Sequence, residues 1–299
     1  MAASSSSTKN GSASASTSGI FNEAHSLISR GGLGSASLNA PHLPRPSPAI
    51  QPQELNAALD NYEAQFLPHG PKSLSGIALR SFLLGLALSS TLLLTTSLLF
   101  SIGTPLWRAP FFLAALSVFH FLEFYTTSYA NTSAAKISSF LFSSNGSAYT
   151  VAHTASLLET LLAHTFLPGP LLPRWAHYGA LCAGLACLLV GQAVRAIAML
   201  HAGPNFSHVV RHTKSTSHEL VTTGIYAYLR HPSYFGFFWW GIGTQLVCGN
   251  TVCLVAYTVV LWKFFSSRIS GEEELLVGFF GAEYVGYKAR TRVGIPFIK

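Results

Sequence analysis

Residues 232–266 read PSYFGFFWWGIGTQLVCGNTVCLVAYTVVLWKFFS, two apolar runs joined by Gly249-Asn250. Gly-Asn between apolar segments is a turn signal, so the stretch predicts a helical hairpin over 232–248 and 251–266. Proline suits the first position of a helix because its missing N–H group has no partner there in any case. We therefore expect the first arm of the hairpin to begin at Pro232.

Four further apolar segments precede this hairpin, at 77–102, 106–129, 148–167 and 175–200. Each approaches the roughly 20 residues that a helix needs to cross a bilayer. The chain is 49% hydrophobic and only 10% charged, whereas soluble domains carry about 25% charged residues. The sequence therefore predicts an all-α polytopic membrane protein with about six transmembrane helices.

The first 75 residues differ from the rest in composition. Runs such as SSSSTKNGSASASTSG at 4–19 contain too little apolar surface to offset the entropy of ordering. We expect a disordered tail over 1–75, with a short amphipathic helix possible over 52–66. The remainder divides into a four-helix transmembrane region (76–200) and a C-terminal region (201–299) that holds a polar loop over 201–230, the hairpin and a further helix.

The net charge of +7 is spread thinly, so the sequence contains no dense basic run of the kind that binds nucleic acid. A bias of Lys and Arg toward cytosolic loops explains the net positive charge better than nucleic-acid binding does. With both termini cytosolic, nearly all basic residues of the helix ends fall on the cytosolic side. These are Lys72, Arg80, Lys136, Arg211, Lys214, Arg230 and Arg268, against Arg108 and Arg174 on the other side.

Two polar clusters flank the hairpin: HELVTTGIYAYLRHPSYFGFFWWG at 218–241 and RISGEEELL at 268–276. A hairpin brings such clusters together in space. Ionisable groups beside membrane segments are costly to keep, so we expect a cytosol-facing active site there, where the N–H groups at the start of the helix can hold a polar or anionic group. An interfacial belt of aromatic residues remains the alternative for Tyr226, His231 and Tyr234.

Arg268 and Glu272 are four residues apart and share a helical face. They either bind ligands or form an ordinary surface salt bridge worth at most about 1 kcal/mol. The residues alone leave both possibilities open.

Several ionisable residues lie within the apolar segments and must pair or face a cavity. We expect most to form hydrogen bonds between helices. They are His120, Glu123, His153, Glu159, His164 and Arg195. No metal site is expected: one HxxxH pair, His208 and His212, supplies too few donors, and the four cysteines lie in apolar stretches, where we expect them to be buried.

From about Arg195 to the C-terminus the sequence closely resembles the isoprenylcysteine carboxyl methyltransferases. The resemblance rests on RHPSY at 230–234, GTQ at 243–245, R-x3-EE at 268–273 and a terminal IPFI at 295–298. It implies methylation of the C-terminal carboxylate of a prenylated cysteine in CaaX proteins, with S-adenosylmethionine as cofactor, at the endoplasmic reticulum membrane and with no nucleic acid or metal involved.

The same resemblance implies the site residues. Arg268 faces the substrate and acts in catalysis. The cofactor contacts are His218, Glu219, Leu220, Val221, Tyr226, His231, Pro232, Ser233, Tyr234 and Glu272. A glutamine that contacts the cofactor in some relatives is replaced by Arg211, which leaves that contact in doubt because a cation beside a sulfonium is unfavourable.

The residues suit this chemistry, because a carboxylate nucleophile loses no proton and needs no general base. The enzyme must instead align two groups and remove water from the nucleophile. The prenyl chain would enter from membrane lipid between helices. A phospholipid N-methyltransferase, an NADPH-dependent sterol reductase and a lipid-binding membrane scaffold remain alternatives, whereas a transporter is disfavoured because the chain shows no internal repeat.

Overall fold

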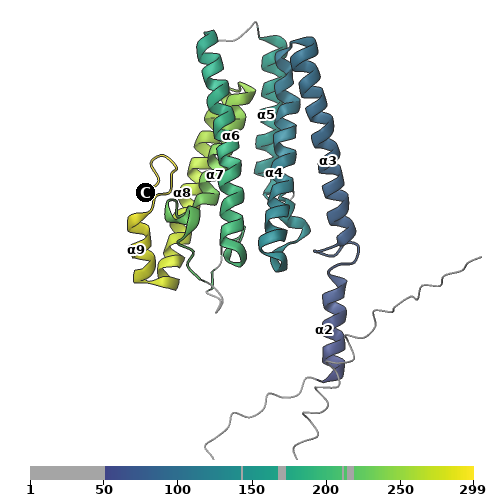
Figure 1. Ribbon diagram of the computed structural model, residues 1–299, viewed down its shortest axis with the longest axis vertical. Helices are drawn as coiled ribbons and strands as arrows, with labels where there is room; N and C mark the ends of the chain where they lie inside the picture. Colours follow the sequence, from purple (N-terminus) through teal and green to yellow (C-terminus); the bar gives the residue numbers. More distant parts are fainter. Residues whose placement is uncertain (1–50, 143, 168–172, 211, 214–218) are drawn as a thin grey trace, which may run out of the picture. The chain divides into compact units, whose positions relative to one another are not determined.

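The computed structural model describes residues 51–142, 144–167, 173–210, 212–213 and 219–299. These residues are helical except for turns and one isolated β-bridge between Leu229 and Arg292, so the all-α prediction is confirmed. The α-helices are α2 (Pro52–Ala64), α3 (Leu74–Thr96), α4 (Arg108–Ala130), α5 (Gly146–Phe166), α6 (Arg174–Ala202), α7 (Pro232–Cys248), α8 (Val252–Phe280) and α9 (Ala282–Arg290) (Figure 1).

The helix positions agree with the apolar segments to within three residues, with two exceptions. The first segment ends in a π-helical turn, Ser97–Ile102, after α3. The last apolar run, expected over 251–266, continues as α8 to Phe280 and carries the RISGEEELL cluster on the same helix. The short helix predicted at 52–66 is present as α2.

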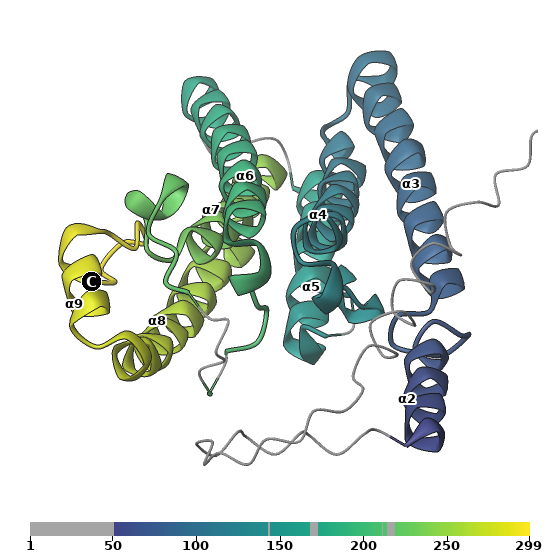
Figure 2. The same ribbon diagram turned by 60° about the horizontal axis from the view of Figure 1, so that its bottom comes forward.

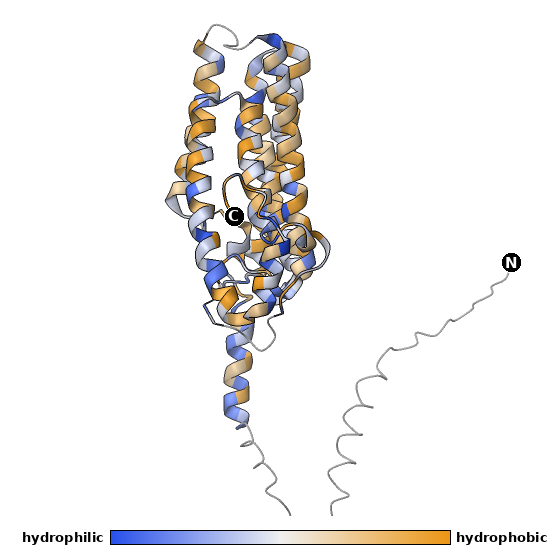
Figure 3. Cartoon of the chain, turned by 90° about the vertical axis from the view of Figure 1, so that its left-hand side faces the viewer, coloured by the Kyte–Doolittle hydropathy of each residue, from blue (hydrophilic) through white to orange (hydrophobic). Residues whose placement is uncertain are grey.

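Helices α3 to α8 run alternately in opposite directions (Figure 1). One end of the helices, here called the pocket end, holds the segments Asn131–Phe140 and Gly203–Asn205. The opposite end holds the turn at Gly249–Thr251. Most residues of the long helices are apolar, and hydrophilic residues are more frequent toward the pocket end (Figure 3); many large apolar side chains of these helices are exposed. The chain is therefore a multi-pass membrane protein.

Four segments of the described chain are long and apolar enough to cross a bilayer: Leu74–Ile102, Pro105–Ala130, Arg174–Asn205 and Val252–Phe280. Helix α7 has only 17 residues, and α5 contains two histidines and a glutamate within its 21 residues. The count of six spans remains a prediction for these two helices.

Glycines allow α6 and α7 to pack backbone against backbone. A Cβ atom on Gly191 of α6 would lie 2.6 Å from both Gly236 O and Trp240 N of α7. A Cβ on Gly243 of α7 would lie 2.5 Å from Leu188 N. Real side chains do not tolerate such distances, so this close approach requires glycine at these positions.

Half-buried polar residues fasten α5 to the α7–α8 turn at the opposite end, as expected for ionisable residues in apolar segments. Glu159 accepts hydrogen bonds from the amides of Thr251, Val252 and Cys253 at 2.7–2.8 Å and thereby caps α8. His164 Nε2 lies 2.8 Å from Cys248 O at the end of α7. His153 departs from this expectation, because its Nδ1 contacts Tyr149 O within α5.

The cysteines are only partly buried. Cys248 and Cys253 lie in the interior, whereas Cys187 is half-buried and Cys182 is exposed on α6. The expectation of burial was wrong for Cys182 because α6 turns that face outward, and an apolar stretch does not reveal which face a membrane helix presents to lipid.

Candidate active site

A pocket of about 160 Å³ opens at the pocket end between α7, α8, α9 and the segment that follows α6. Nine of the residues predicted to contact a cofactor line it, although they come from three separate parts of the chain. They are Glu219, Leu220, Val221, Tyr226, His231, Pro232, Ser233, Tyr234 and Glu272. His218 and Arg211 lie outside the described residues.

Tyr234 stands between the two residues that share the α8 face. Arg268 Nε donates a hydrogen bond to Tyr234 Oη at 2.8 Å, and Tyr234 in turn donates to Glu272 Oε2 at 2.5 Å. Arg268 also lies over the tyrosine ring, 5.5 Å from its centroid. No direct ion pair joins Arg268 to Glu272 among the described residues, so the simple salt bridge that the spacing allowed is replaced by a chain of three polar groups.

The second glutamate of the EE pair, Glu273, holds the first half of the RHPSY box. Its side chain is 7% exposed and accepts hydrogen bonds from Arg230 Nε at 2.5 Å and from His231 Nε2 at 3.3 Å. Lys288 of α9 approaches the same carboxylate at 2.5 Å. The His231 ring also stacks on Tyr234, with centroids 5.4 Å apart. The stacked His231 ring therefore restricts the position of the Tyr234 ring.

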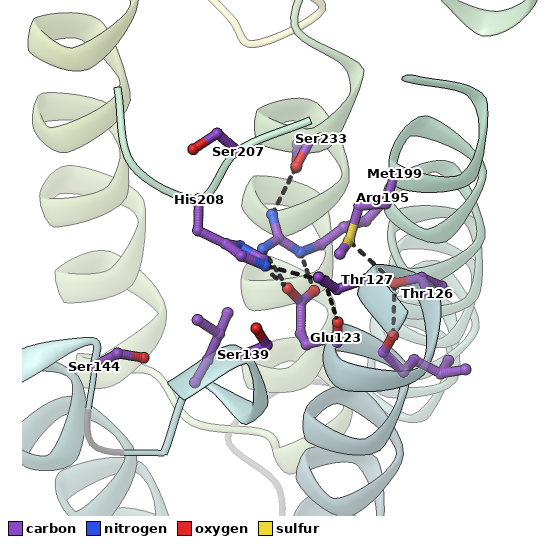
Figure 4. A network of polar contacts seen from close by, with 12 residues as sticks. Glu123, Thr126, Thr127, Ser139, Ser144, Arg195, Met199, Ser207, His208 and Ser233 are labelled. Carbon is purple, nitrogen blue, oxygen red and sulfur yellow. Dashed lines mark hydrogen bonds and ion pairs between the residues drawn. The ribbon is translucent and has the colours of Figure 1, made fainter. Parts of the chain in front are cut away.

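Ser233, in the second half of the RHPSY box, is held by an ion pair between α4 and α6. Arg195 of α6 binds Glu123 of α4 through both carboxylate oxygens and donates from Nη1 to Ser233 Oγ at 2.9 Å and Ser233 O at 3.2 Å. Figure 4 shows these side chains pointing toward one another from α4, α6 and α7. Because a buried charge must be paired, this cluster fixes the start of α7 and with it Ser233 at the pocket wall.

His208 covers this ion pair from the segment after α6. Its Nε2 lies 3.3 Å from Thr127 Oγ1 and its Nδ1 lies 3.8 Å from Glu123 Oε2 (Figure 4). Burial lowers the pKa of His208 to about 4, an effect that the nearby Glu123 opposes and the cations reinforce. The imidazole is therefore neutral near pH 7. Its backbone carbonyl accepts a 2.6 Å hydrogen bond from Arg268 Nη2.

Part of the pocket lining is aromatic and apolar. It includes Tyr284 and Tyr287 of α9 and Leu276 of α8. Tyr287 donates a 2.7 Å hydrogen bond to Tyr226 O, and burial raises the pKa of the Tyr226 phenol. By contrast, Tyr284 Oη and Arg230 Nη2 are buried without any hydrogen-bond partner among the described residues. Both residues line the pocket, and unsatisfied buried polar atoms of this kind are what a ligand can satisfy.

Several residues of the site were not expected from the sequence as members of it. The sequence prediction assigned Glu272 and His231 to the site but not the adjacent Glu273 and Arg230. A carboxylate beside a pocket and an arginine beside His231 are nevertheless natural ion-pair partners. Tyr284 and Tyr287 are three apart, a spacing that places both on one face of a helix. This spacing, just after the Gly281 turn, was the available signal.

Comparisons with known proteins identify the family. Residues 184–278 match the model of the isoprenylcysteine carboxyl methyltransferase family. A protein-S-isoprenylcysteine O-methyltransferase of Saccharomyces cerevisiae is 49% identical over 189 residues, which cover 62% of this chain and 79% of that protein. The Homo sapiens protein of the same name is 42% identical over 188 residues, 63% of this chain and 64% of its own length.

A solved structure agrees with the sequence comparison. It is that of a eukaryotic intramembrane Ras methyltransferase, an isoprenylcysteine carboxyl methyltransferase, which superposes with a TM-score of 0.68 at 32% identity. The match covers 83% of this chain and 88% of that structure. A shared fold, a matching family model and identity near one half over 189 residues agree: this chain belongs to the isoprenylcysteine carboxyl methyltransferase family.

Proposed function

We propose that this protein transfers a methyl group from S-adenosylmethionine to the C-terminal carboxylate of a prenylated cysteine at the end of processed CaaX proteins. The observation that carries the proposal is the chain from Arg268 through Tyr234 to Glu272. It places a cationic group suited to a carboxylate next to an anionic group suited to an ammonium. A methyl transferase of this kind must hold both.

The pocket has the donor and acceptor groups that S-adenosylmethionine requires. Glu272 is half-buried at the pocket wall and offers a carboxylate for the ammonium of the methionine moiety. Tyr284 Oη and Arg230 Nη2 have hydrogen-bonding capacity left over, and the apolar lining residues, Leu276 among them, suit a flat heterocycle. When bound, this cofactor supplies an electrophilic methyl group on a sulfonium.

We assign the substrate carboxylate to Arg268. Its Nε and Nη2 groups are engaged by Tyr234 and by His208 O, while Nη1 makes no hydrogen bond among the described residues. With Nε and Nη2 already engaged, Nη1 is the nitrogen left to meet the substrate, which favours contact with a single carboxylate oxygen and leaves the other oxygen free to react. A carboxylate needs no base to activate it, so orientation and removal of water are the tasks left to these side chains.

The prenyl chain would reach this site from the membrane, because the helices expose many large apolar side chains, among them Leu93, Val151 and Leu189. Each CH2 group that stays in an apolar environment contributes about 0.8 kcal/mol. We further propose that the protein lies in the endoplasmic reticulum membrane with the pocket end in the cytosol, in keeping with the cationic residues at that end.

The first test replaces Glu272 by glutamine and measures S-adenosylhomocysteine binding by calorimetry. A charged hydrogen bond contributes about 1.5–3 kcal/mol, so affinity should fall roughly ten- to a hundredfold. Glu274→Gln is the matched control, because Glu274 is exposed on the same helix and does not line the pocket. Equal affinities of the two variants would remove Glu272 from the cofactor site.

The reaction itself is tested with methyl-labelled S-adenosylmethionine and a farnesylcysteine analogue in reconstituted membranes. The label should be released as methanol by alkali, as expected of a methyl ester. Alkali-stable label in phospholipid amines, with none in the farnesylcysteine, would instead indicate the phospholipid N-methyltransferase reaction.

A further inference from the structure

A second cavity lies beside the C-terminal segment and shares Arg230 with the pocket. It has a volume of about 640 Å³ and is lined by Arg230 and by residues 288–299 other than Arg290 and Phe297. Four cationic side chains line it: Arg230, Lys288, Arg292 and Lys299. The rest of the lining is largely apolar, and no described lining residue is acidic.

The positive charge of this cleft is only partly balanced. Glu273 lies behind the wall and pairs with Arg230 and Lys288. Arg292 and Lys299 are exposed and form no ion pair within the described part of the chain. Two cations therefore remain for an anion from outside, at the open side of the cleft.

The cleft also lies against the membrane-facing helices. The indole of Trp239 on α7 donates a hydrogen bond to Gly294 O at 3.2 Å, and that of Trp262 on α8 donates to Pro296 O at 2.9 Å. Lys263, next to Trp262, is exposed. Tryptophan with a neighbouring lysine is typical of the membrane–water interface.

Phe297 projects from the segment held by these indoles. Its side chain is 93% exposed, and its backbone has the left-handed φ of 63° that bulky residues rarely adopt. Because the ring is almost fully exposed, packing against the described residues does not account for this strained backbone. Contact with lipid accounts for it, since the ring then enters an apolar phase.

We propose that this cleft binds an anionic phospholipid, with the headgroup at Arg292 and Lys299 and the acyl chains beside Phe297. A soluble anion would use the cations but not the apolar lining, whereas a phospholipid uses both. Arg230 lines both cavities and donates from Nη1 to Thr291 O at 2.9 Å. Lipid bound in the cleft would therefore stabilise the segment that supports the RHPSY box. This proposal does not depend on which substrate is methylated.

The two indoles beside the cleft allow a direct test. The full-length protein is placed in phosphatidylcholine nanodiscs containing a small fraction of phosphatidylserine with brominated acyl chains, which quenches tryptophan on contact. Brominated phosphatidylcholine at the same fraction measures non-selective contact. Excess quenching by phosphatidylserine should be lost in the R292Q/K299Q variant, with an affinity decrease of about thirtyfold.

The control variant R290Q/K136Q removes the same charge from exposed positions outside the cleft and should keep the excess quenching. Equal thermal midpoints of all variants in pure phosphatidylcholine establish that each is folded. Equal quenching by both brominated lipids in the unmodified protein, or an equal loss in the control variant, contradicts the proposal. Abolition of the excess by inorganic phosphate would contradict it too, since the cleft would then bind a soluble anion.

Discussion

At the scale of single residues, Tyr234 has the most consequential contacts. It receives a hydrogen bond from Arg268, donates one to Glu272 and is stacked against His231. The spacing of Arg268 and Glu272 allowed a surface salt bridge, and the structure places the phenol between them instead. The two charged groups are thereby kept apart and fixed, so each can meet a ligand group of opposite charge.

Tyr284 gives a prediction at this scale. Its hydroxyl is buried and unpaired without ligand, so Tyr284→Phe should leave the thermal midpoint of the ligand-free protein unchanged or higher. If the hydroxyl bonds to the cofactor, the same change should weaken S-adenosylhomocysteine binding about two- to tenfold by calorimetry.

Tyr257→Phe is the matched control for that measurement. Tyr257 also has an unpaired buried hydroxyl, but it lies in the α7–α8 core and does not line the pocket. If the Tyr284→Phe and Tyr257→Phe variants bound S-adenosylhomocysteine with equal affinity, the Tyr284 hydroxyl would be excluded from the cofactor site.

At the scale of helices, the site depends on how closely α6 approaches α7. Gly191 and Gly236 meet backbone to backbone, and Arg195, one turn from Gly191, reaches Ser233 across that contact. The view in Figure 2 shows α6 and α7 side by side, with α8 and α9 beyond them. The glycine contact therefore controls where the wall of the pocket lies.

Gly191→Ala should disturb this contact. The added methyl group would meet the α7 backbone at 2.6 Å, and such overpacking typically costs 1–3 kcal/mol, with a lower thermal midpoint as the result. Gly179→Ala on the same helix is the control, because its Cβ would have no neighbour within 4 Å. That change should be neutral or slightly stabilising. Equal thermal midpoints for the two variants would contradict the close packing.

The sequence predicted the helices well but their partners poorly. Apolar runs and turn signals such as Gly249-Asn250 are local, so the arms of the hairpin were located to within a residue except where α8 continues. The pairing of Glu123 with Arg195 joins residues 72 positions apart, and no local pattern specifies it. The same holds for Glu273: the sequence presents three adjacent glutamates, and only the packing of α9 and the RHPSY box distinguishes them.

At the scale of the whole molecule, the alternating helices place the pocket, the cationic residues and the C-terminal cleft toward one side. The positive-inside bias then predicts that this side is cytosolic. Sequons at Asn131, Asn145 and Asn205 should remain unglycosylated, whereas a sequon inserted beside Arg174 should be modified in sealed microsomes. A gel shift at Asn205 in the unmodified protein would reverse the orientation.

The most direct measurement of the central claim is the turnover of Arg268→Lys with saturating cofactor and a farnesylcysteine substrate. Lysine keeps the charge but not the planar donor geometry, and a misplaced reacting group can cost on the order of a hundredfold in rate. We expect a folded variant with normal S-adenosylhomocysteine affinity and turnover reduced by about that factor. Turnover close to that of the unmodified protein would contradict the assignment of Arg268 to the substrate carboxylate.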